Sequence, residues 1–400
     1  VDESLEAVTK LLMTKPRNIA YVVTITGCGG RGSNWKTMLE GAAVLSHSIY
    51  MNSVRTPRSG SKYDFQMYAI VHPDARKCLG DDKGLERLGY KVLIKDVPID
   101  PTKIRGKDLR EAIVRSGCCQ DKELLKLYGY TLVDHDAVVM VDLDVLVLNP
   151  LDNLFDSMLD EDSPVKDDLP IMFDKPAPPK INAFFTRDYG MLNPGQFAEG
   201  VVPGVQGGFI VIKPDIEVFE EYRHIILKGH FSDGRGWGDV KNGGRFWGDA
   251  QIQGLCSYYY EVLHPNEGVE LNRCIYNSMI DKKYFDETNT CVTAEEECED
   301  CEQTEVQYIK TVHFTVCQKP WQCENFDFGH SRDFLCNTLH DEWFRVRKNL
   351  EDMWAEKYDW TPPKLHEGKG DEEPIRLGYC KNYGERHYLP IEIPTAIPIR

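Results

Sequence analysis

Two aspartates that lie two positions apart follow a strongly apolar run in this sequence. The run reads AVVMV, from Ala137 to Val141, and Asp142 and Asp144 come directly after it. Such a run is typical of a strand buried on both faces, and in extended backbone the two carboxylates point to the same side. Open α/β sheets bind ligands at the carboxyl ends of their strands. The spacing therefore predicts a ligand site at this position.

Two neighbouring carboxylates repel each other unless a divalent cation neutralises them. Mg²⁺ and Mn²⁺ prefer oxygen ligands, so the pair indicates a metal site. In the alternative interpretation one aspartate caps the following turn and the other is solvated. The run VLVL after Asp144 favours the metal, because it keeps the segment near the core, where an unpaired charge is costly.

A glycine-rich loop is the second candidate site. Residues 27–32 read GCGGRG, a G-x-G-x-x-G string between the strand-like YVVTIT and a helical pattern. Such a loop can hold phosphate at a helix N-terminus. A nicotinamide dinucleotide also requires an acidic residue about 20 positions on, whereas the next strand-like run, DFQMYAIV, ends in HPD well beyond that spacing. Another nucleotide, a nicotinamide and a loop without a ligand all stay open.

Cysteines are concentrated in one part of the chain. The sequence has 13, and a dense group is formed by Cys291, Cys298, Cys301, Cys317, Cys323 and Cys336. This clustering indicates disulfides and an oxidising lumen of the Golgi type, with the cytoplasm as the alternative. The CEDC segment, from Cys298 to Cys301, could instead bind zinc, but a second C-x-x-C is missing.

Composition narrows the class of protein. The formal net charge is −17 and there is no run of Lys or Arg, which argues against a nucleic-acid partner. No apolar stretch reaches the length of about 18 residues that a membrane span needs, and an anchor upstream of Val1 stays open. Strand-like runs alternate with helical patterns, so we expect an α/β fold whose mainly parallel, Rossmann-like sheet is flanked by helices.

Changes in residue composition along the chain suggest three regions. Residues 1–16 read as an N-terminal extension or stem, 17–330 as the main domain, and 331–400 as a helical and Pro-rich tail that continues a Cys-rich segment. Within the main domain, Asp156 to Gly204 is rich in Pro, Asp and Gly and reads as loops. Tyr258 to Tyr260 are expected to be buried in a helix, and Trp321 to be a packing anchor.

Four ordered motifs carry a resemblance to a known family. The segment KLYGYTLVDHDAVVMVDLDVLVLNPLDNLFD resembles the D-x-D segment of retaining sugar-nucleotide transferases similar to glycogenin and galactinol synthase, which form glycosyltransferase family eight. YVVTIT and EGAAVLSHSI resemble that family's opening strand and helix, and VHFTVCQKPW is similar to its closing H-F-x-x-x-x-K-P-W. The resemblance covers about residues 19 to 325 and implies a GT-A fold.

The resemblance also implies a set of donor-binding residues. Asp142, Asp144 and His313 would hold Mn²⁺ or Mg²⁺ against the diphosphate of a UDP-sugar, with Leu143 between the aspartates. The other residues implied at the donor site include the lysines that reach the diphosphate, the threonines at the strand end that receives uracil, and two residues of the segment VQGGFIV: Lys126 and Lys319, Thr24 and Thr26, Gln206 and Gly208. Gln206 stands where the family usually has Asn.

The segment FWGDAQIQG resembles the family's D-x-x-D-Q-G helix start. Asp249 and Gln253 fit as catalytic residues, and Ile252 replaces the second aspartate. The implied activity is transfer of a hexosyl group, with retention, from UDP-glucose, UDP-galactose or UDP-glucuronate. The acceptor (carbohydrate, polyol, lipid or protein) and a homodimer stay open. The alternative is a catalytically inactive glycan- or nucleotide-binding protein.

Overall fold

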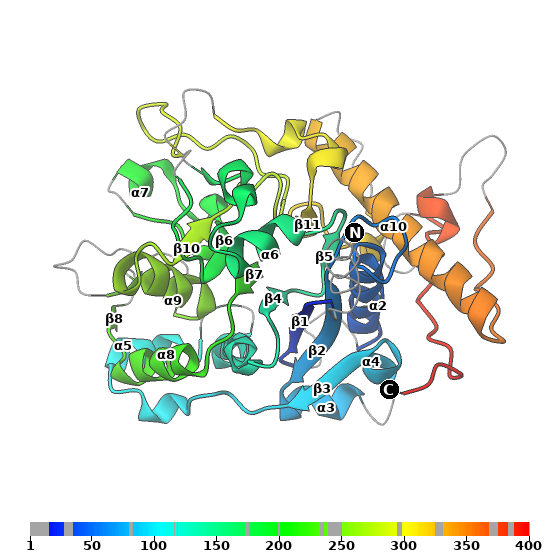
Figure 1. Ribbon diagram of the computed structural model, residues 1–400, viewed down its shortest axis with the longest axis horizontal. Helices are drawn as coiled ribbons and strands as arrows, with labels where there is room; N and C mark the ends of the chain where they lie inside the picture. Colours follow the sequence, from blue (N-terminus) through cyan, green and yellow to red (C-terminus); the bar gives the residue numbers. More distant parts are fainter. Residues whose placement is uncertain are drawn as a thin grey trace, which may run out of the picture.

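A seven-stranded sheet forms the centre of the molecule, in the order β10-β6-β7-β4-β1-β2-β3 (Figure 1). This computed structural model describes residues 16–27, 35–79, 83–115, 117, 119–172, 176–198, 201–232, 236–238, 250–293, 298–324, 331–367, 375–382 and 388–399. The sheet strands are β1 (Asn18–Ile25), β2 (Asp64–Val71), β3 (Tyr90–Ile94), β4 (Ala137–Val141), β6 (Ala183–Arg187), β7 (Val205–Ile212) and β10 (Gly268–Glu270).

The sheet is mainly parallel. β1 pairs in parallel with β2 and β4, β2 with β3, and β6 with β10, whereas β7 is antiparallel to both of its neighbours. Two smaller sheets pair β5 (Val145–Val147) with β11 (Thr311–His313), and β8 (Phe231–Ser232) with β9 (Gly236–Trp237). The expected α/β class with a mainly parallel sheet is therefore confirmed.

Helices cover both faces of the sheet. They are α2 (Trp35–Met51), α3 (Pro73–Leu79), α4 (Gly84–Arg87), α5 (Lys107–Ala112), α6 (Asp152–Leu159), α7 (Pro194–Ala198), α8 (Ile216–Lys228), α9 (Ile252–Tyr258) and α10 (Ser331–Lys357), with the longer 3₁₀ segment η2 (Gln120–Thr131) and the π-helical η7 (Tyr259–Leu263). Alternate residues of β1 explain the two layers. Ile19 and Val23 pack in the core under α2 and α6, while Ala20 and Val22 pack in the core under η2, α5, α8 and α9.

Helix α8 shows how the sequence sets an element's limits. Asp215 caps its N-terminus by accepting a hydrogen bond from the Glu217 backbone N–H at 2.7 Å, and Gly229 ends it with a left-handed φ of 68°. Between these ends Phe219, Tyr222, Ile225 and Ile226 are buried. Their spacing places one apolar face of the helix on the sheet.

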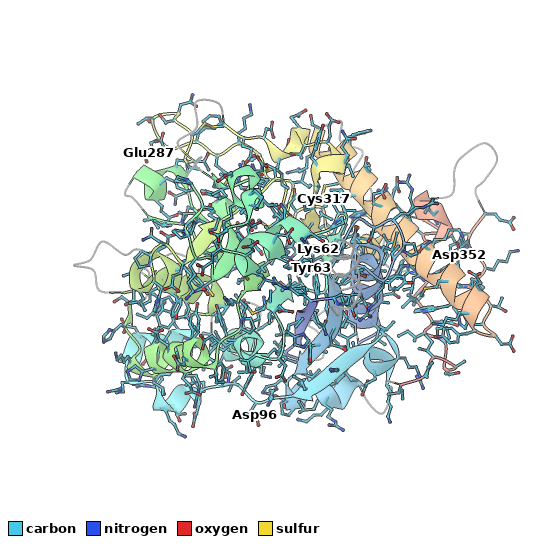
Figure 2. The ribbon with its side chains drawn as sticks, viewed as in Figure 1. Lys62, Tyr63, Asp96, Glu287, Cys317 and Asp352 are labelled. Carbon is cyan, nitrogen blue, oxygen red and sulfur yellow. A yellow bond between two sulfur atoms is a disulfide. The ribbon has the colours of Figure 1, made fainter. Side chains whose placement is uncertain are left out.

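Helix α10 packs beside α2 (Figure 1). Arg347 of α10 is fully buried, and its guanidinium lies 3.0 Å from Glu351 and 3.4 Å from Glu40 of α2. Trp321, which precedes α10 in the chain, contacts Trp343 of α10 with ring centroids 5.8 Å apart, as expected for a packing anchor. Figure 2 shows the side chains that fill the space between the layers, with Asp96, Glu287 and Asp352 at the periphery. These exposed acids belong to the strongly negative surface.

One expectation about the loops was wrong. The segment from Asp156 to Gly204 contains β6, a fully buried strand with the sequence AFFTR. Its five residues are too few to stand out among the surrounding Pro and Asp, and pairing with β7 and β10 stabilises it. Of the tyrosine cluster, Tyr259 and Tyr260 are buried as expected and Tyr258 is partly exposed.

Candidate metal centre

Asp142, Asp144 and His313 converge at the carboxyl end of β4. The imidazole Nε2 of His313 lies 3.3 Å from an oxygen of Asp144 and 4.0 Å from an oxygen of Asp142. One ligand atom from each residue lies within 4.8 Å of the other two. Two carboxylates and an imidazole are a donor set that suits Mn²⁺ or Mg²⁺. The residues present therefore fit the metal expected from the sequence.

Strand pairing brings His313 to Asp144 from 169 positions away along the chain. In the β5–β11 pair His313 faces Val145, and the backbone N–H of Phe314 donates to the carbonyl of Asp144 at 2.9 Å. The N–H of Asp142 donates to the carbonyl of Gly208 in β7 at 3.1 Å. Each of the two aspartates is thus held by a backbone hydrogen bond from a different strand or turn.

Two lysines neutralise the aspartates. Lys126 is buried in η2, and its Nζ lies 2.9 Å from Asp142 and donates to the carbonyl of Gly207 at 2.8 Å. Lys319 pairs with Asp144 and donates to the carbonyl of Phe314 at 2.6 Å. Both lysines implied by the resemblance therefore lie at the centre itself.

The charges around Asp144 control its ionisation. Burial by itself would raise the pKa of this carboxyl, but the nearby His313 and Lys319 outweigh burial and hold the pKa well below its usual range. The two cations therefore favour the ionised form of Asp144. An ionised carboxylate is the form that binds a cation.

Gly208 makes room for the histidine. A Cβ added at Gly208 would lie 2.2 Å from Cε1 and 2.5 Å from Nδ1 of His313, so the ring occupies the space above the glycine. Gln206 accepts a hydrogen bond from the Gly208 N–H at 2.6 Å and another from Asn277 at 3.1 Å. Gln206 is buried and orders the backbone beneath the imidazole, without being one of the three candidate ligands.

Gly41 makes room for the loop between the aspartates. A Cβ added there would lie 2.4 Å from the carbonyl oxygen of Leu143. Helix α2 can therefore approach the loop closely, and Leu143 is partly buried against the core. Packing of Leu143 thus helps to fix the backbone between the two aspartates.

Three of the remaining predicted residues, Thr24, Thr26 and Gln253, lie near the same end of the sheet. Thr24 and Thr26 are partly exposed at the end of β1, which pairs with β4 up to Val22 and Met140. Gln253, in the first turn of α9, has its Cγ 3.4 Å from a Cβ built on Gly207. Asp249 and residues 28–34 of the glycine-rich loop lie outside the described residues.

Sequence reasoning missed Asp188, which follows β6. Burial, together with the neighbouring charge of Asp281, raises the pKa of Asp188 to about 6, although His313 acts in the opposite direction. His313 is thus one of the charged groups that act on Asp188. Its only sequence signal is an acid in TRDYG after a strand that was not expected, so the pattern gave no reason to select it.

Disulfides join cysteines of the Cys-rich group to one another and to the rest of the chain. Among the described residues the pairs are Cys274–Cys301, Cys291–Cys298, Cys317–Cys336 and Cys323–Cys380. The zinc hypothesis for CEDC is therefore wrong, because both of its cysteines are bonded to other cysteines. Cys256 is an unpaired, buried thiol, and burial raises its pKa to about 12. The clustering correctly predicted disulfides.

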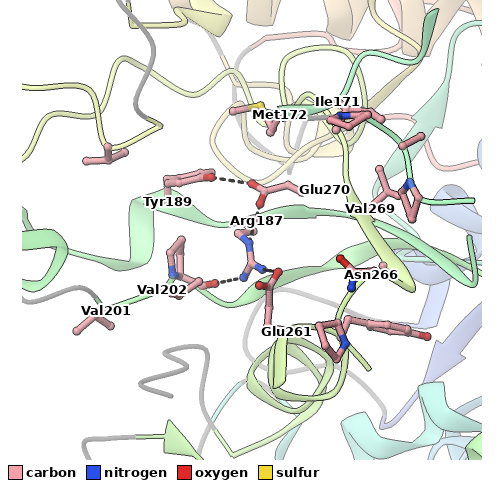
Figure 3. A pocket seen from close by; sticks show the side chains of 18 of the residues that line it. Ile171, Met172, Arg187, Tyr189, Val201, Val202, Glu261, Asn266, Val269 and Glu270 are labelled. Carbon is pink, nitrogen blue, oxygen red and sulfur yellow. Dashed lines mark hydrogen bonds and ion pairs between the residues drawn. The ribbon is translucent and has the colours of Figure 1, made fainter. Parts of the chain in front are cut away.

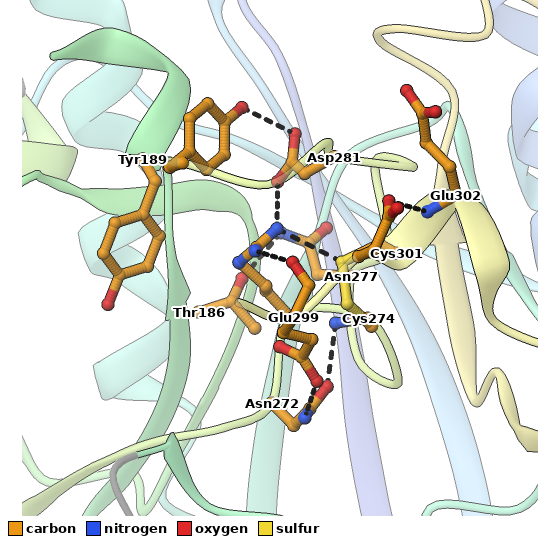
Figure 4. Close-up of polar contacts among 12 residues, drawn as sticks. Thr186, Tyr189, Asn272, Cys274, Asn277, Asp281, Glu299, Cys301 and Glu302 are labelled. Atoms are coloured by element: carbon orange, nitrogen blue, oxygen red, sulfur yellow. Dashed lines mark hydrogen bonds and ion pairs between the residues drawn. A yellow bond between two sulfur atoms is a disulfide. The ribbon is translucent and has the colours of Figure 1, made fainter. Parts of the chain in front are cut away.

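The Cys274–Cys301 disulfide anchors the segment that supports His313 (Figure 4). Arg273 is buried beside it, with Nη1 3.2 Å from the Cys301 sulfur and 3.6 Å from Asp281. Further along the same segment, Ser278 accepts a hydrogen bond from the His313 N–H at 2.9 Å. The disulfide, the Arg273–Asp281 ion pair and the hydrogen bond from His313 therefore all hold the segment 273–281 in place.

No family model and no curated protein sequence matches this chain. Among solved structures, the apo bifunctional glycosyltransferase WbbM has 12% identity and a TM-score of 0.44, with 86% of this chain and 51% of that chain covered. This chain thus spans about half of the WbbM chain.

Two other solved structures are also similar. The galactosyltransferase LgtC in complex with donor and acceptor sugar analogues has 11% identity, 85% and 100% coverage of the two chains, and a TM-score of 0.40. Mouse xyloside xylosyltransferase 1 has 14% identity, 74% and 98% coverage, and a TM-score of 0.41. With likeness at this level, any assignment of activity depends on the site itself. Among the described residues, no helix combines the length and apolarity of a membrane span.

Proposed function

We propose that the protein is a metal-dependent glycosyltransferase of the GT-A class that transfers a hexosyl group, with retention, from a UDP-sugar to an acceptor. The observation that carries the proposal is the convergence of Asp142, Asp144 and His313 next to two lysines. The four sequence motifs that resemble glycosyltransferase family eight agree with it, because the motifs contribute these same residues.

The residues divide the work in the following way. Asp142, Asp144 and His313 would hold the divalent ion, which when bound offsets the negative charge that develops on the departing UDP. Lys126 and Lys319 bind the same diphosphate and stabilise its charge. Their side chains already lie at the aspartates, so donor binding requires them to exchange one anionic partner for another. Thr24 and Thr26 contact the uracil at the end of β1.

The neutral amide of Gln253 is a poor nucleophile, which favours attack on the same face of the sugar over a covalent intermediate. In this proposal the leaving phosphate accepts the proton of the acceptor hydroxyl. Asp249 orients the sugar hydroxyls. The competing proposal, a binding protein without turnover, is motivated by Ile252, which is fully buried in the apolar core and adds no carboxylate to the site.

Release of UDP from UDP-glucose, UDP-galactose and UDP-glucuronate distinguishes the two proposals. We expect the wild-type protein to release UDP from at least one donor with Mn²⁺ or Mg²⁺ and not with EDTA. Asp142→Asn and Asp144→Asn should each reduce the rate by about 100-fold, and the exposed Asp96→Asn should not. Metal-dependent release that survives Asp142→Asn would refute the assigned roles. NMR of the product tests retention.

The compartment follows as a further part of the proposal. The four disulfides among the described residues are compatible with an oxidising lumen such as the Golgi, where disulfides persist. Microscopy of the full-length protein with a tag at its C-terminus tests this assignment, and a purely cytosolic signal would contradict it.

A further inference from the structure

A cavity opens beside the edge strand β10, and we call it the edge cavity (Figure 3). Its volume is about 690 Å³, within the range of small-molecule sites. Ile171 and Met172 lie on one side of it, and Val201 and Val202 lie on another. These apolar walls can cover the carbon-bound hydrogens of a ligand.

Arg187 lies at the centre of the edge cavity and is fully engaged with the protein. Its Nε is 2.8 Å from Glu270, its Nη2 is 2.5 Å from Glu261, and its Nη1 donates to the carbonyl of Pro203 at 2.6 Å. Tyr189 donates to the other oxygen of Glu270 at 2.6 Å. The Arg187 side chain is only 3% exposed, so its guanidinium has little capacity left to bind an anionic ligand.

The remaining polar groups make the edge cavity negative. Three acids line the cavity: Glu261, Glu270 and Asp286. Arg187 is the only cation among the described lining residues, so the net charge of the lining is −2. Phosphate and carboxylate groups are disfavoured there. The side chain of Glu261 is 44% exposed, and Asn266 lies nearby with its side chain at the cavity. Both can accept hydrogen bonds from hydroxyl groups.

The edge cavity and the metal centre both lie at the end of the sheet where β4 and β6 finish. Arg187 ends β6, and it pairs with Val205 at the start of β7, the strand that carries Gly208. Thr186, next to the lining residue Arg187, accepts a hydrogen bond from Asn277 at 3.0 Å, and Asn277 also donates to Gln206 beneath the imidazole. One short segment thus links the two sites.

We infer that the edge cavity binds the acceptor as an uncharged sugar, with its apolar face on Met172, Val201 and Val202 and its hydroxyls donating to Glu261 and Asn266. This inference rests on the proposed function, because only a transferase needs an acceptor. It selects carbohydrate among the acceptor classes that the sequence left open, and it excludes anionic sugars.

Binding of matched aryl glycosides tests the inference. The probes are the p-nitrophenyl β-D-glucoside, galactoside and xyloside, with the p-nitrophenyl glucuronide as the anionic counterpart of the glucoside. We expect at least one neutral glycoside to bind in titration calorimetry, and the glucuronide to bind at least about tenfold more weakly than the glucoside. Val202→Trp, which fills the cavity, should abolish binding, whereas the exposed Val114→Trp should not.

A second variant guards against a folding defect in Val202→Trp. Glu261→Gln keeps the shape of the side chain, and it should weaken binding of the neutral glycoside severalfold while narrowing its advantage over the glucuronide. The matched control is Glu356→Gln on the exposed face of α10. Equal binding of glucoside and glucuronide, the absence of any binding, or binding unchanged by both cavity variants would each overturn the inference.

Release of UDP by the wild-type protein, measured without any glycoside, distinguishes failure of the acceptor inference from failure of the proposed function. Metal-dependent release together with unchanged glycoside binding in the cavity variants removes the inference and leaves the proposed function intact. Absence of release with every donor removes the proposed function, and the acceptor assignment falls with it.

Discussion

Gly208 and His313 are complementary in shape: the imidazole fills the space where a side chain at position 208 would begin. The glycine is in a buried strand that also holds the backbone of Asp142. The position of the candidate metal ligand therefore depends on a missing methyl group in another strand.

Gly208→Ala should displace the His313 ring and weaken Mn²⁺ binding by about 10- to 100-fold, because the added Cβ would lie within 2.5 Å of two ring atoms. Electron paramagnetic resonance of free Mn²⁺ measures the affinity. Gly207→Ala is the matched control, since its Cβ would have its nearest neighbours at 3.4 Å. Equal affinities in the two variants would contradict the role given to Gly208.

Lys126→Met should have opposite effects on metal and nucleotide. Its Nζ lies 2.9 Å from Asp142, so losing the positive charge removes a competitor and should increase Mn²⁺ affinity by about three- to tenfold in the absence of UDP. UDP affinity should fall, because the diphosphate loses a cationic partner. Both constants can be measured by calorimetry, with Lys122→Met, whose partner is Asp74, as the control. A parallel loss of both affinities would count against this model.

Asp188 should make the protein less stable as the pH rises. Its pKa is raised to about 6 in the folded protein, from 3.8, so the folded state binds a proton more tightly than the unfolded chain. The stabilisation is complete below about pH 4 and is lost as the pH rises through 6, and it amounts to at most about 3 kcal/mol.

Urea unfolding of the metal-free protein between pH 4 and pH 7 tests this dependence. In Asp188→Asn the unfolding free energy should fall less as the pH rises, because the titrating carboxyl is gone. The exposed Asp96→Asn variant should show the same decline as the wild type. If wild type and Asp188→Asn show the same pH dependence, Asp188 does not titrate as inferred.

Removing Cys274–Cys301 should affect both stability and the metal centre. The double variant Cys274→Ala/Cys301→Ala should lose about 2–4 kcal/mol of unfolding free energy, because the disulfide closes a loop with a sequence separation of 27. It should also weaken Mn²⁺ binding, since the adjoining segment holds the backbone of His313.

The Cys291–Cys298 pair, with a separation of only 7, provides a matched control. Its double alanine variant should lose less stability and retain wild-type Mn²⁺ affinity. Should the two variants lose metal affinity equally, the segment beside Cys274 would have no special part in positioning the histidine.

Local patterns were sufficient for much of the fold. The strand-like runs YVVTIT, DFQMYAIV and AVVMV correspond to β1, β2 and β4, and α8 begins after Asp215 and ends at Gly229, residue types that typically cap a helix. These elements could be predicted because burial on two faces and helix capping act on neighbouring residues. The β6 strand could not, because its five residues depend on pairing with distant strands.

The sequence by itself determined the chemistry that is available: two carboxylates on one side of an extended segment, and cysteines crowded enough to bond. The tertiary structure alone decided which residues meet. His313 reaches Asp144 only because β11 pairs with β5, and Gly208 leaves room for it only because β7 lies beside β4. Pairing between strands far apart in the chain has no local pattern, since its free energy comes from contacts that exist only in the folded protein.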